Sequence, residues 1–165
     1  MSEVTSCLAD VVQQSCIALF SHYQIAIAPS TCKPSREVVL CGIIGFTGDD
    51  LRGSLMLACS REPLELAQDG GDVSMRDWLA ELTNQLLGRV KNRLLAFGTV
   101  IHCSTPVVLG GERIAPIASQ PLGHLFTADG GVVSVWFDTE VRADFVLSPL
   151  DDLSVLGQEG DALLF

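Results

Sequence analysis

The sequence predicts an α+β fold in which long helices pack on a mainly antiparallel β-sheet. Predicted elements come in blocks: a helix, strands and a short helix, and then a second long helix followed by strands. Glycine- and aspartate-rich turns join neighbouring strands, which is typical of hairpins rather than of parallel strands linked by helices. Of the 165 residues 48% are hydrophobic, which is enough to bury a core.

The first half of the chain is expected to begin with a helix over residues 6–20, because its apolar positions recur at helical spacing. Strands are predicted over residues 37–46 and 53–59, and residues 47–50 between them have turn chemistry. A short helix is predicted over residues 63–68, since proline suits a first helical turn.

The second half repeats this plan. Ser74 is a suitable N-cap and Asp77 completes a start that resembles a capping box, so a long helix is predicted over residues 75–97. An irregular segment is expected around Gly110 and Gly111. The predicted extended segments of this half are residues 100–104, 106–109, 122–127, 132–138 and 141–147.

We interpret residues 1–150 as a single domain that contains two pseudo-repeats, at about 5–70 and 74–148. The repeats share their order of elements, and a glycine precedes a hydrophobic strand in each. Residues 151–165 are acidic and glycine-spaced, so we predict a loosely ordered C-terminal tail.

Charge and cysteine content narrow the class of protein. The net charge is −10 with only ten basic residues, which argues against nucleic-acid binding because phosphate affinity needs clustered Lys and Arg. The six cysteines lie in apolar stretches without CxxC spacing, so reduced core thiols are predicted. The N-terminus does not resemble a signal peptide and no apolar run reaches about 18 residues, so we expect a cytoplasmic protein with no membrane span.

The second long helix is predicted to expose a polar face. A helical projection places Glu81, Asn84, Gln85, Gly88 and Lys91 together, and Glu81 and Asn84 are neighbours at i, i+3 spacing. The missing side chain of Gly88 leaves a notch beside Asn84 that another surface can approach. By pattern alone, such a face is more commonly just solvated. The opposite, apolar side consists of Leu79, Leu82, Leu86, Leu87, Val90 and Leu94.

Two segments resemble a known family. Residues 81–91 read ELTNQLLGRVK, an E-x-x-N-x-x-x-G pattern, and residues 104–111 read STPVVLGG. Together they resemble the CheX branch of the CheC/CheX/FliY family over residues 5–148. That resemblance implies a CheC-like fold of two pseudo-symmetric halves, and hydrolysis of the phosphoaspartate of a CheY-like response-regulator receiver domain. Asp10 is followed by Gln13 on the first helix, where the family pattern needs Asn, so that half is expected to be inactive.

The resemblance also implies roles for individual residues. Asn84 is hypothesised to orient the attacking water, and Glu81 to pair with a lysine of the receiver. Gln85, Gly88 and Lys91 are hypothesised to form the rest of the docking face. The chain is expected to need no cofactor of its own, because Mg²⁺ is expected on the partner receiver. The family suggests a homodimer, for which the stretch 132–147 offers a candidate exposed sheet edge.

Two other functions stay open at this stage. The chain can be a non-catalytic module that binds a receiver or a flagellar-switch protein, or a small-molecule enzyme with an internal pocket. Structural roles are favoured for the histidines, since His102 and Cys103 are adjacent in a predicted strand and point to opposite faces. Solvated loops are favoured over metal sites for the acidic pairs at 49–50 and 151–152.

Overall fold

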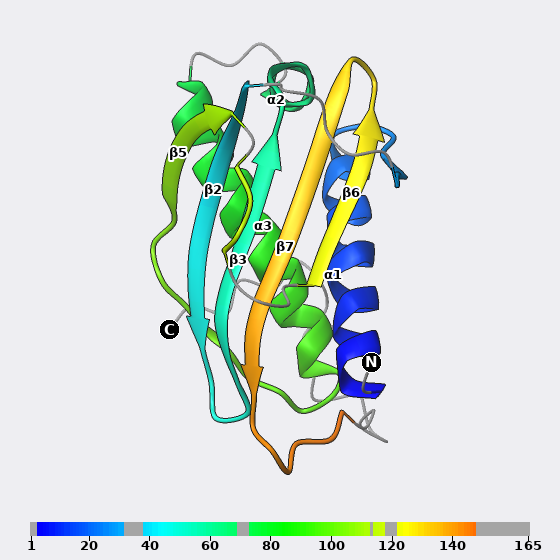
Figure 1. The fold of residues 1–165 in the computed structure, drawn as a ribbon, viewed down its shortest axis with the longest axis vertical. Helices are drawn as coiled ribbons and strands as arrows, with labels where there is room; N and C mark the ends of the chain where they lie inside the picture. The colour runs from blue at the N-terminus through cyan, green and yellow to red at the C-terminus, as the bar shows by residue number, and fades with distance from the viewer. Residues whose placement is uncertain (1–2, 32–37, 69–72, 113, 118–121, 148–165) are drawn as a thin grey trace.

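Antiparallel pairing organises the whole sheet in the computed structural model, which describes residues 3–31, 38–68, 73–112, 114–117 and 122–147 (Figure 1). Within these residues seven strands form one sheet of order β1-β6-β7-β3-β2-β4, and β5 also pairs with β2. The described helices and strands are α1 (Glu3–His22), β1 (Ala28–Pro29), β2 (Val38–Thr47), β3 (Leu51–Cys59), α2 (Arg61–Gln68), α3 (Met75–Leu95), β4 (His102–Cys103), β5 (Val107–Glu112), β6 (Leu122–Ala128) and β7 (Gly131–Val141). The α+β prediction is confirmed.

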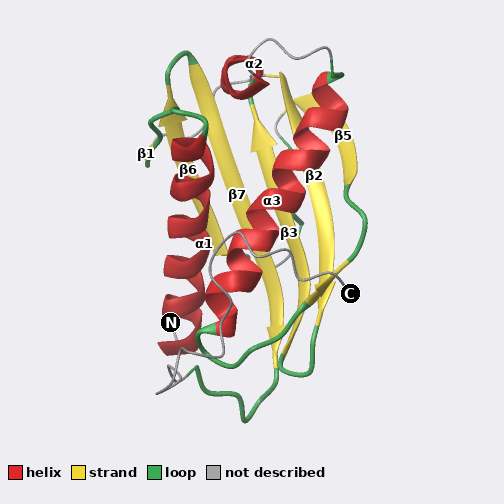
Figure 2. Ribbon diagram, turned by 180° about the vertical axis from the view of Figure 1, so that it is seen from behind, coloured by secondary structure: helices red, strands yellow, loops and turns green. Residues whose placement is uncertain are grey.

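The two long helices cover the same face of the sheet (Figure 2). Helix α1 lies over β6 and β7, and α3 crosses β2 and β3 obliquely and packs against α1. The strands alternate, so that Leu55, Leu57 and Phe137 are fully buried toward the helices. The core therefore lies between the sheet and this pair of helices, and one side of α3 stays at the surface.

Each half of the chain packs its helix and its edge strand on the other half. The hairpin β2–β3 from the first half is covered by α3 and is flanked by β4 and β5, all from the second half. The hairpin β6–β7 from the second half is covered by α1 and flanked by β1, both from the first half. The hairpins join through β3 and β7, whose register runs from Leu51↔Val141 to Cys59↔Val133.

Three details of the second half differ from prediction. No strand covers 141–147; β7 ends at Val141 and a turn follows, closed by a hydrogen bond from Phe145 N to Arg142 O of 3.0 Å. The exposed edge expected at 132–147 is wrong, because β7 lies between β3 and β6. Gly110 and Gly111, expected to be irregular, pair with β2 inside β5. Residues 151–165 lie outside the described residues.

Helix α1 has the length and hydropathy of a membrane span, although no such span was expected from the sequence. It is long enough to cross a membrane, and an 18-residue window within it has a mean hydropathy of 1.2. Its apolar side is used inside the protein, however, where Leu8, Val12, Leu19 and Phe20 are almost fully buried against the sheet and α3. Helix α1 is therefore a core helix in this fold.

Candidate active site

The polar face predicted on α3 is built on a well-defined helix start. Ser74 is the N-cap: its hydroxyl accepts a hydrogen bond from Asp77 N (3.2 Å) and donates one to the Asp77 carboxylate (2.6 Å). The predicted leucine stripe is fully buried. Cap and stripe together fix the rotation of the helix, which determines the side chains that reach solvent.

A glycine in β2 brings α3 unusually close to the sheet. A Cβ atom on Gly42 would lie 2.0 Å from Thr83 Oγ1 and 3.0 Å from Thr83 Cβ, so only glycine fits there. Thr83 is fully buried, and its hydroxyl donates to Leu79 O at 2.7 Å. Because Asn84 follows Thr83 directly, this contact sets the height of Asn84 above the sheet.

The five predicted site residues share one side of α3, but they differ in solvent exposure. Glu81 and Asn84 are exposed, whereas Gln85, Gly88 and Lys91 are half-buried. The Asn84 side chain makes no hydrogen bond to any residue that the structure describes. Gly88 has nothing within 4 Å of the position that a Cβ would take, so packing within the described chain does not require glycine there.

Glu81 is held by a chain of hydrogen bonds that begins on the other helix. The Gln85 amide nitrogen donates to Glu81 Oε1 at 2.9 Å, and the Tyr23 hydroxyl donates to Gln85 Oε1 at 2.8 Å. Tyr23 directly follows α1, so the network spans the gap between the two helices. The site thus pairs an oriented carboxylate with an uncommitted carboxamide one turn away.

No thiol or histidine among the described residues forms a hydrogen bond with Glu81 or Asn84. Cys16, Cys41 and Cys59 are buried and reduced, as predicted. Burial raises the pKa of the Cys41 thiol to about 11 and that of Cys59 well above the ordinary value, so neither is a thiolate at neutral pH. Cys103 departs from the prediction because it is exposed, and desolvation still raises its pKa.

Two of the histidines, His102 and His124, lie on strands of the sheet. His124 lies on β6, where burial lowers its pKa, and it is thus held in the neutral form. His102 and Cys103 pair with Thr47 and Phe46, which face opposite sides of the sheet, so they form no dyad. No group of three His, Cys, Asp or Glu side chains that can hold a metal occurs in the described part of the chain.

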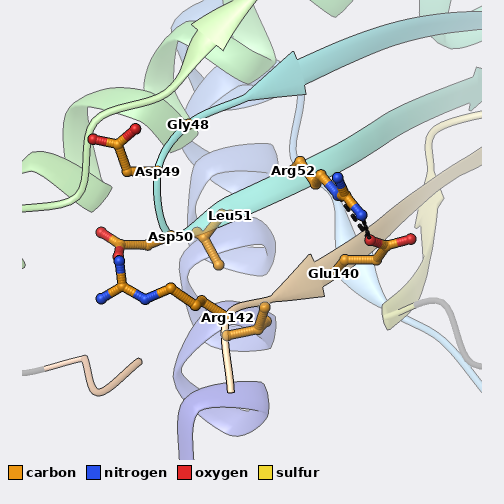
Figure 3. Close-up of a pocket in the computed structure, with 8 residues that line it drawn as sticks. Gly48, Asp49, Asp50, Leu51, Arg52, Glu140 and Arg142 are labelled. Atoms are coloured by element: carbon orange, nitrogen blue, oxygen red, sulfur yellow. Dashed lines mark hydrogen bonds and ion pairs between the residues drawn. The ribbon is translucent and has the colours of Figure 1, made fainter. Parts of the chain in front are cut away.

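A charged pocket adjoins the β2–β3 turn (Figure 3). This turn lies at the end of the sheet opposite to the start of α3 (Figure 1). The pocket has a volume of about 290 Å³ and is lined by the β2–β3 turn and the end of β7. Both arginines that line it are paired with carboxylates: Arg142 with Asp50 at 3.0 Å and with Asp144 at 2.7 Å, and Arg52 with Glu140, to which it donates. Asp50, one of the acidic pair at 49–50, therefore belongs to an ion-pair cluster.

A second pocket, of about 400 Å³, lies near the start of α3 and is mostly apolar. Its charged lining residue, Arg61, is paired with Glu65 at 2.6 Å. The polar face of α3 lines neither of these two pockets.

Sequence reasoning missed two residues that shape this face. Tyr23 gave no signal, because its contact with Gln85 joins residues 62 positions apart. Gly42 did carry a signal in the sequence, since glycine inside a strand often marks the close approach of another element. Neither residue lies within the pattern 81–91.

Comparison with protein families identifies a matching family. The model for the chemotaxis phosphatase CheX matches residues 40–122, just over half of the chain, a span that contains all of α3. No curated protein matches the chain.

Solved structures of CheX proteins share the fold. Chemotaxis protein CheX from Vibrio vulnificus aligns with a TM-score of 0.69 at 20% identity, over 84% of this chain and 100% of that one. CheX from Desulfovibrio desulfuricans aligns with a TM-score of 0.65 at 18% identity, over 82% and 99%. The CheX–CheY–BeF3–Mg²⁺ complex from Borrelia burgdorferi gives a TM-score of 0.58 at 18% identity, over 79% and 96%.

Proposed function

The chain belongs to the CheX family of chemotaxis phosphatases, and from this premise we propose that it hydrolyses the phosphoaspartate of a CheY-like receiver domain in the cytoplasm. The observation that carries the proposal is the contrast between two neighbours on α3. Glu81 is oriented by hydrogen bonds inside the chain, whereas the exposed Asn84 carboxamide is uncommitted within the described residues. The first suits docking, and the second suits a reacting centre.

Asn84 is assigned to the attacking water. Its carboxamide oxygen can accept from the water and its nitrogen can donate to a phosphoryl oxygen, and it adds no charge that repels the phosphate. The water oxygen forms a bond to phosphorus, the bond to the aspartyl oxygen breaks and the carboxylate leaves; the water protons pass to phosphate and solvent. Positioning of this kind is the main contribution that an acyl phosphate needs.

Glu81 is assigned to docking, through an ion pair with a receiver lysine that fixes the register of the complex. Gly88 gives the partner access beside Asn84, and Lys91 attracts an acidic receiver surface. Mg²⁺ is assigned to the receiver. Gln85 borders this face, and the docking role predicted for it stays a prediction, since both ends of its amide bind within the chain.

A homodimer also stays a prediction. The margins of the described sheet are formed by β1 on one side and by β4 and β5 on the other, so pairing between sheets of two copies would use these strands rather than β7. The molar mass in solution tests this assembly.

The proposal is tested by mixing the protein with a panel of phosphorylated receivers and following phosphate release. The wild-type protein should accelerate release from at least one receiver. Asn84→Ala should lower kcat by about a hundredfold without weakening binding, whereas Asn84→Asp should lower kcat as far and also weaken binding, because its charge repels the phosphate. Glu81→Ala should raise KM roughly tenfold and change kcat less.

Asn92→Ala is the matched control, because Asn92 is an exposed asparagine two turns further along α3. It should leave both constants unchanged. Full activity of the Asn84 variants overturns the assignment of the water-orienting residue. Receiver binding without phosphate release by the wild-type protein identifies the non-catalytic module instead.

A further inference from the structure

We infer that Tyr23 and Gln85 are positioning residues that hold the Glu81 carboxylate in the orientation in which it docks on the receiver. The inference rests on the proposed function and extends it to α1, which carries no residue of the E-x-x-N pair. It assigns a role to a hydrogen-bond network that joins the two helices over the polar face.

The donors and acceptors of this network fit together in one arrangement of the hydrogen bonds. An ionised carboxylate only accepts hydrogen bonds, so the Gln85 amide must turn its nitrogen toward Glu81. The amide oxygen then faces α1, where it needs a donor, and the Tyr23 hydroxyl supplies it at 2.8 Å. Tyr23 therefore fixes the orientation of the amide, and the amide fixes one carboxylate oxygen. The other Glu81 oxygen has no partner among the described residues.

Tyr23 is itself held from two directions. Helix α1 ends in a Schellman-type turn, with hydrogen bonds of 3.0 Å from Ile25 N to Phe20 O and from Gln24 N to Ser21 O, and with Gln24 at φ 60°. The Tyr23 ring packs edge-on against Trp78, with ring centroids 5.4 Å apart. Because Trp78 precedes Glu81 by one turn of α3, the phenol is fixed relative to the same helix that it orients.

Restricting Glu81 matters because an exposed glutamate otherwise samples several rotamers. Ordering a side chain on association costs binding free energy, and a side chain that is already held avoids much of that cost. Loss of the network should thus weaken docking by about three- to tenfold. It should leave the chemical step unchanged, since no described hydrogen bond links the network to Asn84.

The test is a double-mutant cycle on the phosphatase reaction. Tyr23→Phe removes only the hydroxyl, and Gln85→Met keeps length and volume without the amide. Each is combined with Glu81→Ala, and KM and kcat are measured for a phosphorylated receiver. Each single variant should raise KM three- to tenfold at constant kcat, and neither should raise KM further once Glu81 is replaced.

Two controls separate positioning from general stability. Gln13→Met makes the same substitution at a half-buried position of α1 and should leave KM unchanged. The side-chain amide resonances of Gln85, followed by NMR, should move in both Tyr23→Phe and Glu81→Ala while the backbone spectrum persists. This readout needs no enzymatic activity.

The outcomes are distinguishable. A wild-type protein that releases no phosphate from any receiver overturns the proposed function. An active wild type whose Tyr23→Phe and Glu81→Ala effects on KM add independently overturns the positioning role alone. A fall in kcat at constant KM, or amide resonances that do not respond to Tyr23→Phe, overturns it as well.

Discussion

At the scale of one residue, Gly88 is a glycine inside a helix that no contact in the described chain requires. Glycine costs about 1 kcal/mol relative to alanine inside a helix. At Gly42 a close contact requires glycine, but at Gly88 a Cβ atom would meet nothing within 4 Å. Packing in the described chain therefore does not offset the cost at Gly88, and the docking role proposed for this residue offers a reason for it.

Replacement of Gly88 should consequently separate stability from function. Gly88→Ala should raise the free energy of unfolding by about 0.5–1 kcal/mol, as measured by urea denaturation. Gly88→Leu should weaken receiver binding roughly tenfold or more, as measured by titration, because its side chain fills the notch beside Asn84. Gln14→Leu, at an exposed position of α1, is the control for added hydrophobic surface. Unchanged binding by Gly88→Leu contradicts the docking role.

The pattern of residues on α3 was sufficient to predict which side chains share a face, because helical periodicity is a local property. It placed Glu81 and Asn84 at the surface and the leucines in the core, and burial confirms this arrangement. It could not reveal that Gln85 turns inward to Tyr23, since that bond depends on how α1 ends and crosses α3.

At the scale of elements, the contact between β2 and α3 determines where the polar face stands. Strand β2 has no side chain at Gly42, and Thr83 of α3 fills the space that a side chain would need. The helix, with its apolar stripe already buried, has no room to rotate or rise at this point. The position of Asn84 is thus determined by a residue more than forty positions earlier in the chain.

Gly42→Ala should destabilise the protein by about 1–3 kcal/mol, because the added methyl group overlaps Thr83 Oγ1. Thr83→Ala removes the overlapping atom and should recover part of this loss in the double variant. Urea unfolding of the two single variants and the double variant measures the coupling. Strictly additive losses contradict the assignment of this contact.

Strand prediction failed where the chain turns after β7, next to a cluster of ion pairs. Residues 141–147 contain hydrophobic residues at strand-like spacing, yet Arg142 donates its backbone N–H to Asp50 O at 2.9 Å and pairs with the carboxylates of Asp50 and Asp144. These partners come from the β2–β3 turn and from the bend itself. A local pattern cannot anticipate a turn that a segment 92 positions away stabilises.

At the scale of the molecule, the long helix and the edge strand of each half pack on the hairpin of the other half. We call this arrangement the exchange, and it makes each half depend on the other. Helix α1 packs on β6 and β7 rather than on β2–β3, the hairpin of its own half, while α3 packs on β2 and β3. Neither half taken alone has a long helix over its own hairpin, so each would expose a large apolar sheet face.

Separate expression of residues 1–70 and 71–165 should therefore give two chains without cooperative unfolding transitions. Their co-expression should give a complex that unfolds cooperatively and retains the polar face of α3. Circular dichroism during thermal unfolding and size-exclusion chromatography measure both outcomes. A stable, monomeric first half contradicts the dependence inferred from the exchange.

The sequence by itself determined the class of fold, the hairpins, the start of α3 and the composition of its two faces. These properties depend on periodicity, capping and turn chemistry, which act over a few residues. Tertiary structure alone decided that β7 is central, that Thr83 sits against Gly42 and that Tyr23 reaches Gln85. Each of these contacts joins the two halves of the chain, and their geometry exists only once both halves are packed on one sheet.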